Sequence, residues 1–170
     1  KSKIIRINPG AGFGTGTHET TQLCLQAVAF ALRGAAPGTK VLDFGSGSGI
    51  LSIAAARLGA DVDGVEIDPL AIDNATENLQ LNSKLDSPDG ILTGKVRFAL
   101  RLEELPGEPR KYPIVIANIL RPVLIEFSEL LVGRLARPGG KVVLSGLIAT
   151  DLPDVITRYS SLLGGIRPQI

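Results

Sequence analysis

The chain has 170 residues, 44% hydrophobic and 21% charged, and its 18 Lys and Arg residues against 17 Asp and Glu leave a net charge of +1. This composition is typical of a globular domain, and the balanced charge gives no electrostatic reason to expect binding to nucleic acid or to a membrane surface. Cys24 is the single cysteine, which excludes an intramolecular disulfide and a cysteine-rich metal site; we predict no metal.

Nothing in the sequence indicates insertion into a membrane or secretion. The longest apolar run, residues 27–32, is far shorter than a bilayer-spanning helix, and the first residues lack the apolar segment of a signal peptide. We therefore expect one domain over residues 1–170, located in the cytoplasm, with an organelle left open as an alternative.

The first predicted elements are a glycine-rich segment and a helix. Residues 10–16 contain four glycines around Phe13, and we expect this segment to fold over a ligand as a lid. Residues 20–32 have a helical pattern, with Thr20 or Thr21 as a candidate N-terminal cap. Cys24 is predicted to be buried in the apolar face of this helix.

Short β-branched apolar runs then alternate with helical patterns. The predicted strands are residues 41–44, 62–67, 96–99, 114–117 and 141–145. The predicted helices are residues 50–58, 69–81, 122–135 and 151–159, and residues 82–94 and 105–113 are predicted surface loops. This alternation predicts an α/β, Rossmann-like fold, with a mostly parallel sheet covered by helices on both faces and a ligand at the carboxyl ends of the strands.

The most informative motif is VLDFGSGSG at residues 41–49. Gly45, Gly47 and Gly49 directly follow a strand and precede a helix, so the backbone of this loop can approach a ligand closely. Glu66 lies 23 residues after Asp43, at the end of the second predicted strand. A carboxylate at that position can accept hydrogen bonds from both ribose hydroxyls of an adenosine, so we predict a nucleoside cofactor.

The motif fits some nucleotide-binding patterns poorly. The dinucleotide pattern requires a small residue where this chain has Ile50, and the Gly-Lys-Ser/Thr of phosphate-binding loops is absent from the sequence. A nicotinamide oxidoreductase and a bare strand–helix turn without a ligand are thereby disfavoured but stay open. The pattern G-x-G-x-G after an acid-bearing strand resembles the first motif of class I S-adenosylmethionine-dependent methyltransferases.

Two further stretches, NPGAGFGTGTHETTQLCL at residues 8–25 and ANIL at residues 117–120, narrow the resemblance. Together with the glycine motif and GVEIDPLAI, they resemble the catalytic domain of the ribosomal protein L11 methyltransferase family over residues 8–149. The resemblance implies S-adenosylmethionine as cofactor, with S-adenosylhomocysteine as product. The cofactor-binding residues that it implies are Thr21, Asp43, Gly45, Gly47, Glu66 and Asn118.

The resemblance also implies N-methylation of lysine or α-amino groups on a protein, ribosomal protein L11 or a related one. We hypothesise that Asn118 positions the acceptor amine, although an Asn at a strand end can also be a simple turn residue; no other catalytic residue is identified. His18, the single histidine, is more readily a helix-entry residue than a general base. Another protein or small-molecule acceptor and a non-catalytic binding module remain alternatives.

The sequence departs from the family in several places. The substrate-recognition domain that precedes the catalytic domain in the family is missing, and the final antiparallel strands are missing or truncated, as in a fragment or a shortened relative. Glu19 stands where family members carry Pro, and Pro113 where they carry Asp. After the third predicted strand, Glu103 and Glu104 are the candidate acids on the adenine side. Asp68 fits the start of a helix as well as it fits a ligand contact.

Overall fold

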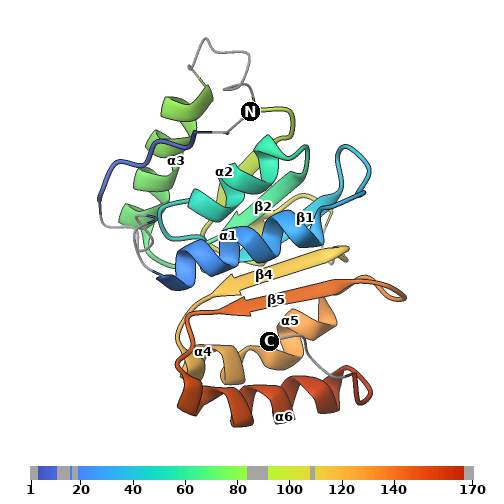
Figure 1. The fold of residues 1–170 in the computed structure, drawn as a ribbon. Coiled ribbons are helices and arrows are strands. Elements are labelled where there is room, and N and C mark those ends of the chain that lie inside the picture. Colours follow the sequence, from blue (N-terminus) through green and yellow to red (C-terminus); the bar gives the residue numbers. More distant parts are fainter. Residues whose placement is uncertain (1–3, 11–15, 17–18, 84–91, 108–109, 167–170) are drawn as a thin grey trace.

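The computed structural model describes residues 4–10, 16, 19–83, 92–107 and 110–166. Its centre is a parallel sheet in the order β3-β2-β1-β4-β5 (Figure 1). The strands are β1 Lys40–Phe44, β2 Asp61–Val65, β3 Val96–Ala99, β4 Ile114–Asn118 and β5 Lys141–Ser145.

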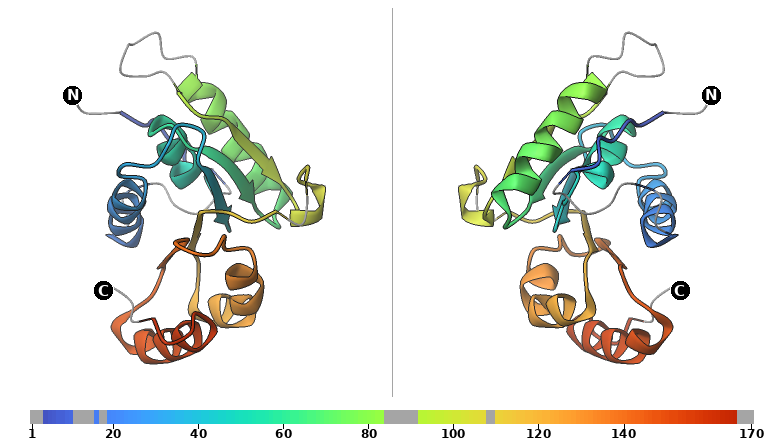
Figure 2. Two further views of the ribbon diagram at one scale, coloured as in Figure 1. Left: turned by 90° about the vertical axis from the view of Figure 1, so that its right-hand side faces the viewer. Right: turned by 90° about the vertical axis from the view of Figure 1, so that its left-hand side faces the viewer.

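Helices cover both faces of this sheet. They are α1 Glu19–Ala31, α2 Ile50–Arg57, α3 Pro69–Ser83, α4 Arg121–Glu126, α5 Ser128–Gly133 and α6 Leu152–Leu162, with short 3-10 turns at Leu102–Glu104 and Ala149–Asp151. Figures 1 and 2 show α1, α2 and α3 on one side and α4, α5 and α6 on the other. The predicted α/β fold with helices on both faces is therefore confirmed.

Two apolar cores follow from this arrangement, because successive side chains of a strand point to opposite faces. Val41, Val62 and Ile116 pack with α1 and α2 in one core. Leu42 and Val115 pack with α4, α5 and α6 in the other. Among the described residues, none of the helices is both long and apolar enough to cross a lipid bilayer.

Strand order reverses between β1 and β4, which lie side by side although β2 and β3 come between them in sequence. Asp43 in β1 is level with Ile116 in β4, so Gly45 and Asn118, each two residues further on, leave the sheet at the same level. The two following loops touch, since a Cβ added at Gly45 would lie 2.4 Å from Cγ2 of Ile119. A ligand site at the carboxyl ends of parallel strands is expected at this reversal.

Several sequence-based predictions of elements need correction. The second strand ends at Val65 rather than at residue 67, and the helix predicted over residues 122–135 is two helices that meet at Phe127. The ring of Phe127 packs against Phe44, with 5.3 Å between centroids. Thr20 and Thr21 are not caps, because α1 already begins at Glu19.

The predicted surface loops are also partly buried. Asn82, predicted as the first residue of a loop, is fully buried within α3. In the segment 105–113, Leu105 and Tyr112 are buried, because the leucine joins the apolar core and the tyrosine hydroxyl reaches Asp63. Periodicity alone missed these contacts, since their partners lie on other strands and helices.

Candidate functional site

The glycine loop joins β1 to α2 and has the backbone geometry that its glycines allow. Gly45, Gly47 and Gly49 have φ values of 78°, 51° and 78°, in the left-handed region that favours glycine. The N–H groups of Gly45 and Ser46 both donate to the carbonyl of Val65, which fixes the start of the loop against the end of β2. Gly49 lies where a Cβ would come within 3.2 Å of Ala75 in α3.

Glu66 borders the loop from the end of β2. Its Oε2 accepts a hydrogen bond from the N–H of Gly47 at 3.0 Å, and its Oε1 accepts one from the N–H of Asp68 at 3.2 Å. The side chain is only half-buried, so lone pairs of both oxygens are accessible to a ligand. Asp68 in turn accepts from the N–H of Leu70 at 2.9 Å, which confirms its role at the start of α3.

Four buried polar atoms at the same end of the sheet have no hydrogen-bond partner within the part of the chain that the structure describes. They come from α1, the end of β1, the glycine loop and the end of β4, and are Thr21 Oγ1, Asp43 Oδ1, Ser46 Oγ and Asn118 Oδ1. A buried polar atom without a partner costs free energy, and native proteins rarely leave several in one place. The residues present therefore fit a polar ligand that would satisfy them.

Asp43 is the most strongly perturbed member of this group. Burial raises the pKa of its carboxyl from 3.8 to about 6, a hydrogen bond from Ser52 opposes the rise, and the charge of Glu66 adds to it. Ser52 Oγ donates to Asp43 Oδ2 at 2.6 Å. Burial, with a smaller contribution from Asp43, also raises the pKa of the Cys24 thiol to about 12, and the predicted burial of Cys24 is confirmed.

The charge at the loop distinguishes between classes of ligand. Asp43 and Glu66 place two carboxylates beside the glycine loop, and the Gly47 N–H already donates to one of them. A pyrophosphate would be repelled here, because like charges at close range disfavour binding. A cationic or neutral nucleoside suits the site better, as does a ligand with hydroxyls that donate to Glu66.

All six residues predicted to hold a cofactor lie at the carboxyl end of the sheet, where Ser145, the partner of Asn118 in β5, donates to the carbonyl next to Thr21; the six are Thr21, Asp43, Gly45, Gly47, Glu66 and Asn118. Phe13 and His18, with most of the predicted lid, lie outside the described residues. Glu103 and Glu104 are exposed in a 3-10 turn, and Glu104 accepts the N–H of Leu100 at 3.0 Å, so neither is singled out as a ligand contact.

Sequence reasoning missed Ser46 and Ser52, although both lie in or next to the glycine motif. The position of Ser46 between Gly45 and Gly47 was the available signal, because a side chain there must lie beside the ligand-facing backbone. For Ser52, the signal was its place in the first turn of α2, nine residues after Asp43. Residues further away in sequence, such as Asn78, gave no such signal.

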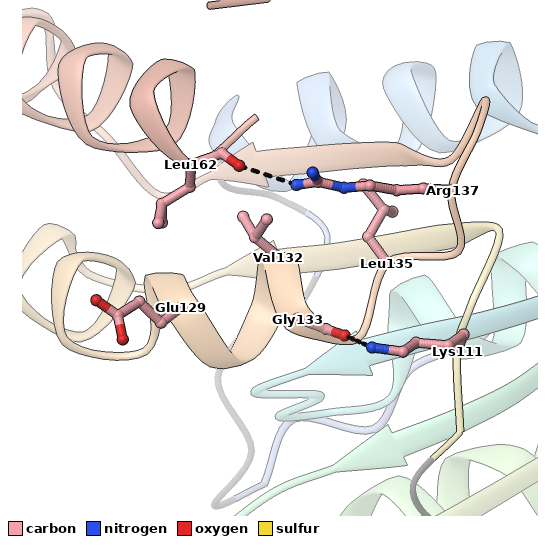
Figure 3. Close-up of a pocket in the computed structure, with 7 residues that line it drawn as sticks. All are labelled: Lys111, Glu129, Val132, Gly133, Leu135, Arg137 and Leu162. Carbon is pink, nitrogen blue, oxygen red and sulfur yellow. Dashed lines mark hydrogen bonds between the residues drawn. The ribbon is translucent and has the colours of Figure 1, made fainter. Parts of the chain in front are cut away.

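A separate open groove lies at the opposite end of the sheet (Figure 3). Its lining comes from the residues before β4 and β5 and from the ends of α5 and α6: Lys111, Glu129, Val132, Gly133, Leu135, Arg137 and Leu162. Lys111 donates to the carbonyl of Gly133, and Arg137 donates to that of Leu162 at 2.9 Å. The groove faces the amino ends of the strands, so it is not part of the glycine-loop site.

The comparisons with known proteins agree with this geometry. The family model described as "Ribosomal protein L11 methyltransferase (PrmA)" matches residues 1–166. The ribosomal protein L11 methyltransferase of Thiobacillus denitrificans is 44% identical over 158 residues, which cover 91% of this chain and 47% of that protein. The protein of that name from a Geobacter species is 42% identical over 163 residues, covering 94% and 50%. The chain thus spans about half the length of these relatives.

Solved structures show the same relationship. The crystal structure of ribosomal protein L11 methylase from Lactobacillus delbrueckii subsp. bulgaricus matches with a TM-score of 0.75 and 32% identity, covering 94% of this chain and 75% of that one. Magnesium protoporphyrin IX methyltransferase from Synechocystis, solved with bound SAM, matches with a TM-score of 0.58 and 22% identity over 82% of this chain and 67% of that one, which shows the shared fold. From its sequence, its fold and the residues at its glycine loop, this chain belongs to the ribosomal protein L11 methyltransferase family.

Proposed function

We propose that the chain is an S-adenosylmethionine-binding catalytic domain that transfers a methyl group to lysine or α-amino nitrogens of a protein, ribosomal protein L11 or a related one. Membership of the family supports the reaction, and the names of the relatives support the substrate. The observation that carries the proposal is the set of buried, unpartnered oxygens around the β1–β4 reversal, together with the Glu66 carboxylate beside the glycine loop. A ribosomal substrate places this activity in the cytoplasm, or in an organelle with its own ribosomes.

The residues of the site divide into two groups by the part of the cofactor that they suit. Glu66 would accept hydrogen bonds from the ribose hydroxyls, and the backbone of Gly45 and Gly47 would lie against the methionine end. Asp43 and Thr21 have buried oxygens without partners, which suit the amino and carboxyl groups of the methionine moiety. When bound, S-adenosylmethionine supplies a methyl group already activated by a sulfonium, so the protein needs neither a metal nor a covalent intermediate.

The chemical difficulty lies with the acceptor. A lysine amine with a pKa near 10.4 is charged at pH 7, and removing its proton costs roughly 4–5 kcal/mol unless its surroundings lower that pKa. An acceptor oxygen that takes a hydrogen bond from the neutral amine offsets part of this cost. Asn118 Oδ1 is buried and has no hydrogen-bond partner among the described residues. It is therefore suited to accept an N–H of the neutral amine, with the lone pair of the nitrogen directed at the methyl group of the cofactor.

Binding of the cofactor is tested by titration calorimetry of the chain with S-adenosylmethionine. We expect Glu66→Ala to weaken affinity at least tenfold, because the ribose hydroxyls lose their acceptor. Glu129→Ala is the matched control, since Glu129 is an exposed acid at the opposite end of the sheet. Equal affinity of both variants and the unmodified chain would show that the ribose contact is assigned wrongly. Binding of NADH without binding of S-adenosylmethionine would indicate a nicotinamide enzyme.

Transfer is tested by incubating the chain with methyl-labelled S-adenosylmethionine and purified ribosomal protein L11. We expect label on amino nitrogens of L11, and loss of label with Asn118→Ala at saturating cofactor. A chain that binds the cofactor and labels neither L11 nor a ribosomal extract would be a binding module rather than this enzyme. Label on a small molecule instead would show that the acceptor is not a protein, and the proposed cofactor site would still hold.

A further inference from the structure

Three asparagines of α3 bind the segment of residues 4–10, which we call the strap. Asn74, Asn78 and Asn82 are spaced four residues apart, so they lie along one side of the helix, and all three are buried. Figure 1 shows the strap in dark blue beside α3. We call these three residues the asparagine ladder.

The ladder holds the strap through backbone groups. Asn82 accepts the N–H of Arg6 at 3.0 Å and donates to the carbonyl of the same residue at 2.7 Å. Asn74 donates to the carbonyl of Asn8 at 3.2 Å, and a Cβ added at Gly10 would lie 2.4 Å from Asn74 Nδ2. Contacts of this kind fix the path of the strap with little dependence on its side chains.

Asn78 links the strap to the glycine loop. Its Oδ1 accepts the N–H of Asn8 at 2.7 Å, and its Nδ2 donates to the carbonyl of Ser48 at 2.9 Å. Because a backbone N–H can only donate, the amide oxygen must face the strap, and the amide nitrogen must face Ser48. One buried side chain therefore joins the strap to the residue between Gly47 and Gly49.

Within the described residues, the side-chain hydrogen bonds of the other two members of the ladder go elsewhere than to the loop. The side chain of Asn82 bonds to Arg6, to the carbonyl of Asn78 and to Arg57, whose Nη2 lies 3.1 Å from Asn82 Oδ1. The Nδ2 of Asn74 bonds to the strap, at the carbonyl of Asn8. The ladder thus provides a member that couples strap and loop, and members that hold the strap only.

We propose that the strap positions the cofactor loop, with Asn78 as the positioning residue. A docked strap fixes the Asn78 amide, the amide fixes the Ser48 carbonyl, and the carbonyl sets the peptide planes of the loop that would face the methionine end of the cofactor. Displacing the strap from α3 leaves the Asn78 oxygen buried without its donor and loosens the loop. The effect on affinity rests on the proposed function, because it requires S-adenosylmethionine to bind at this loop.

The test removes one strap N–H at a time in the full chain. Asn8→Pro deletes the N–H that Asn78 accepts, and the matched variant Arg6→Pro deletes the N–H that Asn82 accepts. We expect Asn8→Pro to raise the Kd for S-adenosylmethionine about fivefold, the equivalent of one hydrogen bond, and to raise KM for the cofactor without changing kcat at saturation. Arg6→Pro should change each of these by less than twofold.

A second readout needs no cofactor. Hydrogen exchange followed by mass spectrometry should show faster exchange over residues 46–49 in Asn8→Pro and no change there in Arg6→Pro. Equal effects of the two variants, or none, would overturn the proposal. If the unmodified chain binds no S-adenosylmethionine, the proposed function fails, whereas the exchange comparison still decides the coupling. If Asn8→Pro has no thermal unfolding transition, the pair Asn78→Ala and Asn82→Ala decides by the same readouts.

Discussion

The backbone N–H of Gly47 donates to the carboxylate of Glu66 across 3.0 Å, which joins the middle of the glycine loop to the end of β2. The second oxygen of the same carboxylate accepts from the N–H of Asp68. Two backbone donors thus hold the side chain in one orientation without any ligand. A charged acceptor that is already oriented loses little conformational entropy when it takes hydroxyl groups as further donors.

Glu66→Gln separates the charge of this side chain from its shape. The amide oxygen can still accept the Gly47 N–H, so we expect the loop to keep its geometry, while the exposed N–H of Asp68 loses its acceptor and the start of α3 loses a little stability. Hydrogen bonds from the ribose hydroxyls to a neutral acceptor are weaker than to a carboxylate, so the Kd for S-adenosylmethionine should rise about tenfold. Calorimetry measures this, with Glu129→Gln as the control. An unchanged Kd would mean that the charge of Glu66 does not act on the ligand.

Most of the candidate site could be predicted from the sequence, because its residues sit at positions with a local signature. Gly45 and Gly47 follow a strand, and Glu66 and Asn118 end strands that a parallel sheet brings to the same edge. The reversal of strand order between β1 and β4 needed only the alternation of strands and helices and the resemblance to the family.

The asparagine ladder could not be predicted in the same way. Asn78 lies on a helix whose polar spacing looks like a solvent-facing surface, and its strap partner is 70 residues away in sequence. Only the packing of α3 against the strap makes that polar side chain a buried one. The break at Phe127 has a similar origin, since the ring of Phe44 that packs against it belongs to a distant strand.

Gly45→Ala should destabilise the chain more than a glycine substitution in open space. Gly45 has φ of 78° and a Cβ there would lie 2.4 Å from Ile119 Cγ2, whereas Gly34 has φ of 74° and an added Cβ meets nothing within 4 Å. Gly34→Ala should lower the free energy of unfolding by about 1–2 kcal/mol, from backbone strain alone. Gly45→Ala should lower it by about 1–3 kcal/mol more, because the added Cβ overpacks against Ile119. Urea unfolding of the two variants measures both losses.

The clash at Gly45 can be relieved by a second substitution. Ile119→Ala removes the Cγ2 atom that a new Cβ would meet, so the double variant Gly45→Ala/Ile119→Ala should lose less stability than the sum of the two single changes. Additive losses would show that the loops after β1 and β4 do not constrain each other.

The buried carboxyl of Asp43 should give stability a defined dependence on pH. Its pKa of about 6 lies above the value of 3.8 for an unperturbed Asp, so the folded chain keeps a proton that the unfolded chain releases between these values. The contribution of Asp43 to stability is therefore complete below about pH 4, falls as pH rises to about 6, and is constant above that, for a total loss of about 3 kcal/mol.

Asp43→Asn removes the titrating group and keeps its size. We measure the free energy of unfolding with urea from pH 4 to pH 7.5 and subtract the value of the unmodified chain from that of Asp43→Asn. This difference should increase up to about pH 6 and then level off. Asp61→Asn is the control, since Asp61 pairs with the half-exposed Lys40. A difference that does not vary with pH would show that Asp43 is ionised throughout.

Asp63 should be the most costly carboxylate to remove, although it lies away from the glycine loop. It is buried in β2 and accepts hydrogen bonds from Arg97 at 2.7 Å, Arg110 at 2.8 Å and the hydroxyl of Tyr112 at 3.1 Å. It thereby ties β2 to β3 and to the segment before β4. Asp63→Ala removes the acceptor of the buried Tyr112 hydroxyl, whereas Arg97 and Arg110 are partly exposed and can turn to solvent. The loss should therefore lie below the roughly 3–5 kcal/mol typical of breaking a fully buried ion pair.

Asp61 provides the comparison within the same strand. Its carboxylate pairs with Lys40 at 2.8 Å near the surface, where such pairs contribute about 1 kcal/mol or less, so Asp61→Ala should barely move the urea midpoint. Asp63→Ala should lower the midpoint more than Asp61→Ala does, and cofactor affinity measured on the fraction that remains folded should be unchanged, because the side-chain partners of Asp63 are Arg97, Arg110 and Tyr112 rather than residues of the glycine loop. Similar midpoints for the two variants would mean that the three donors around Asp63 find other partners when it is removed.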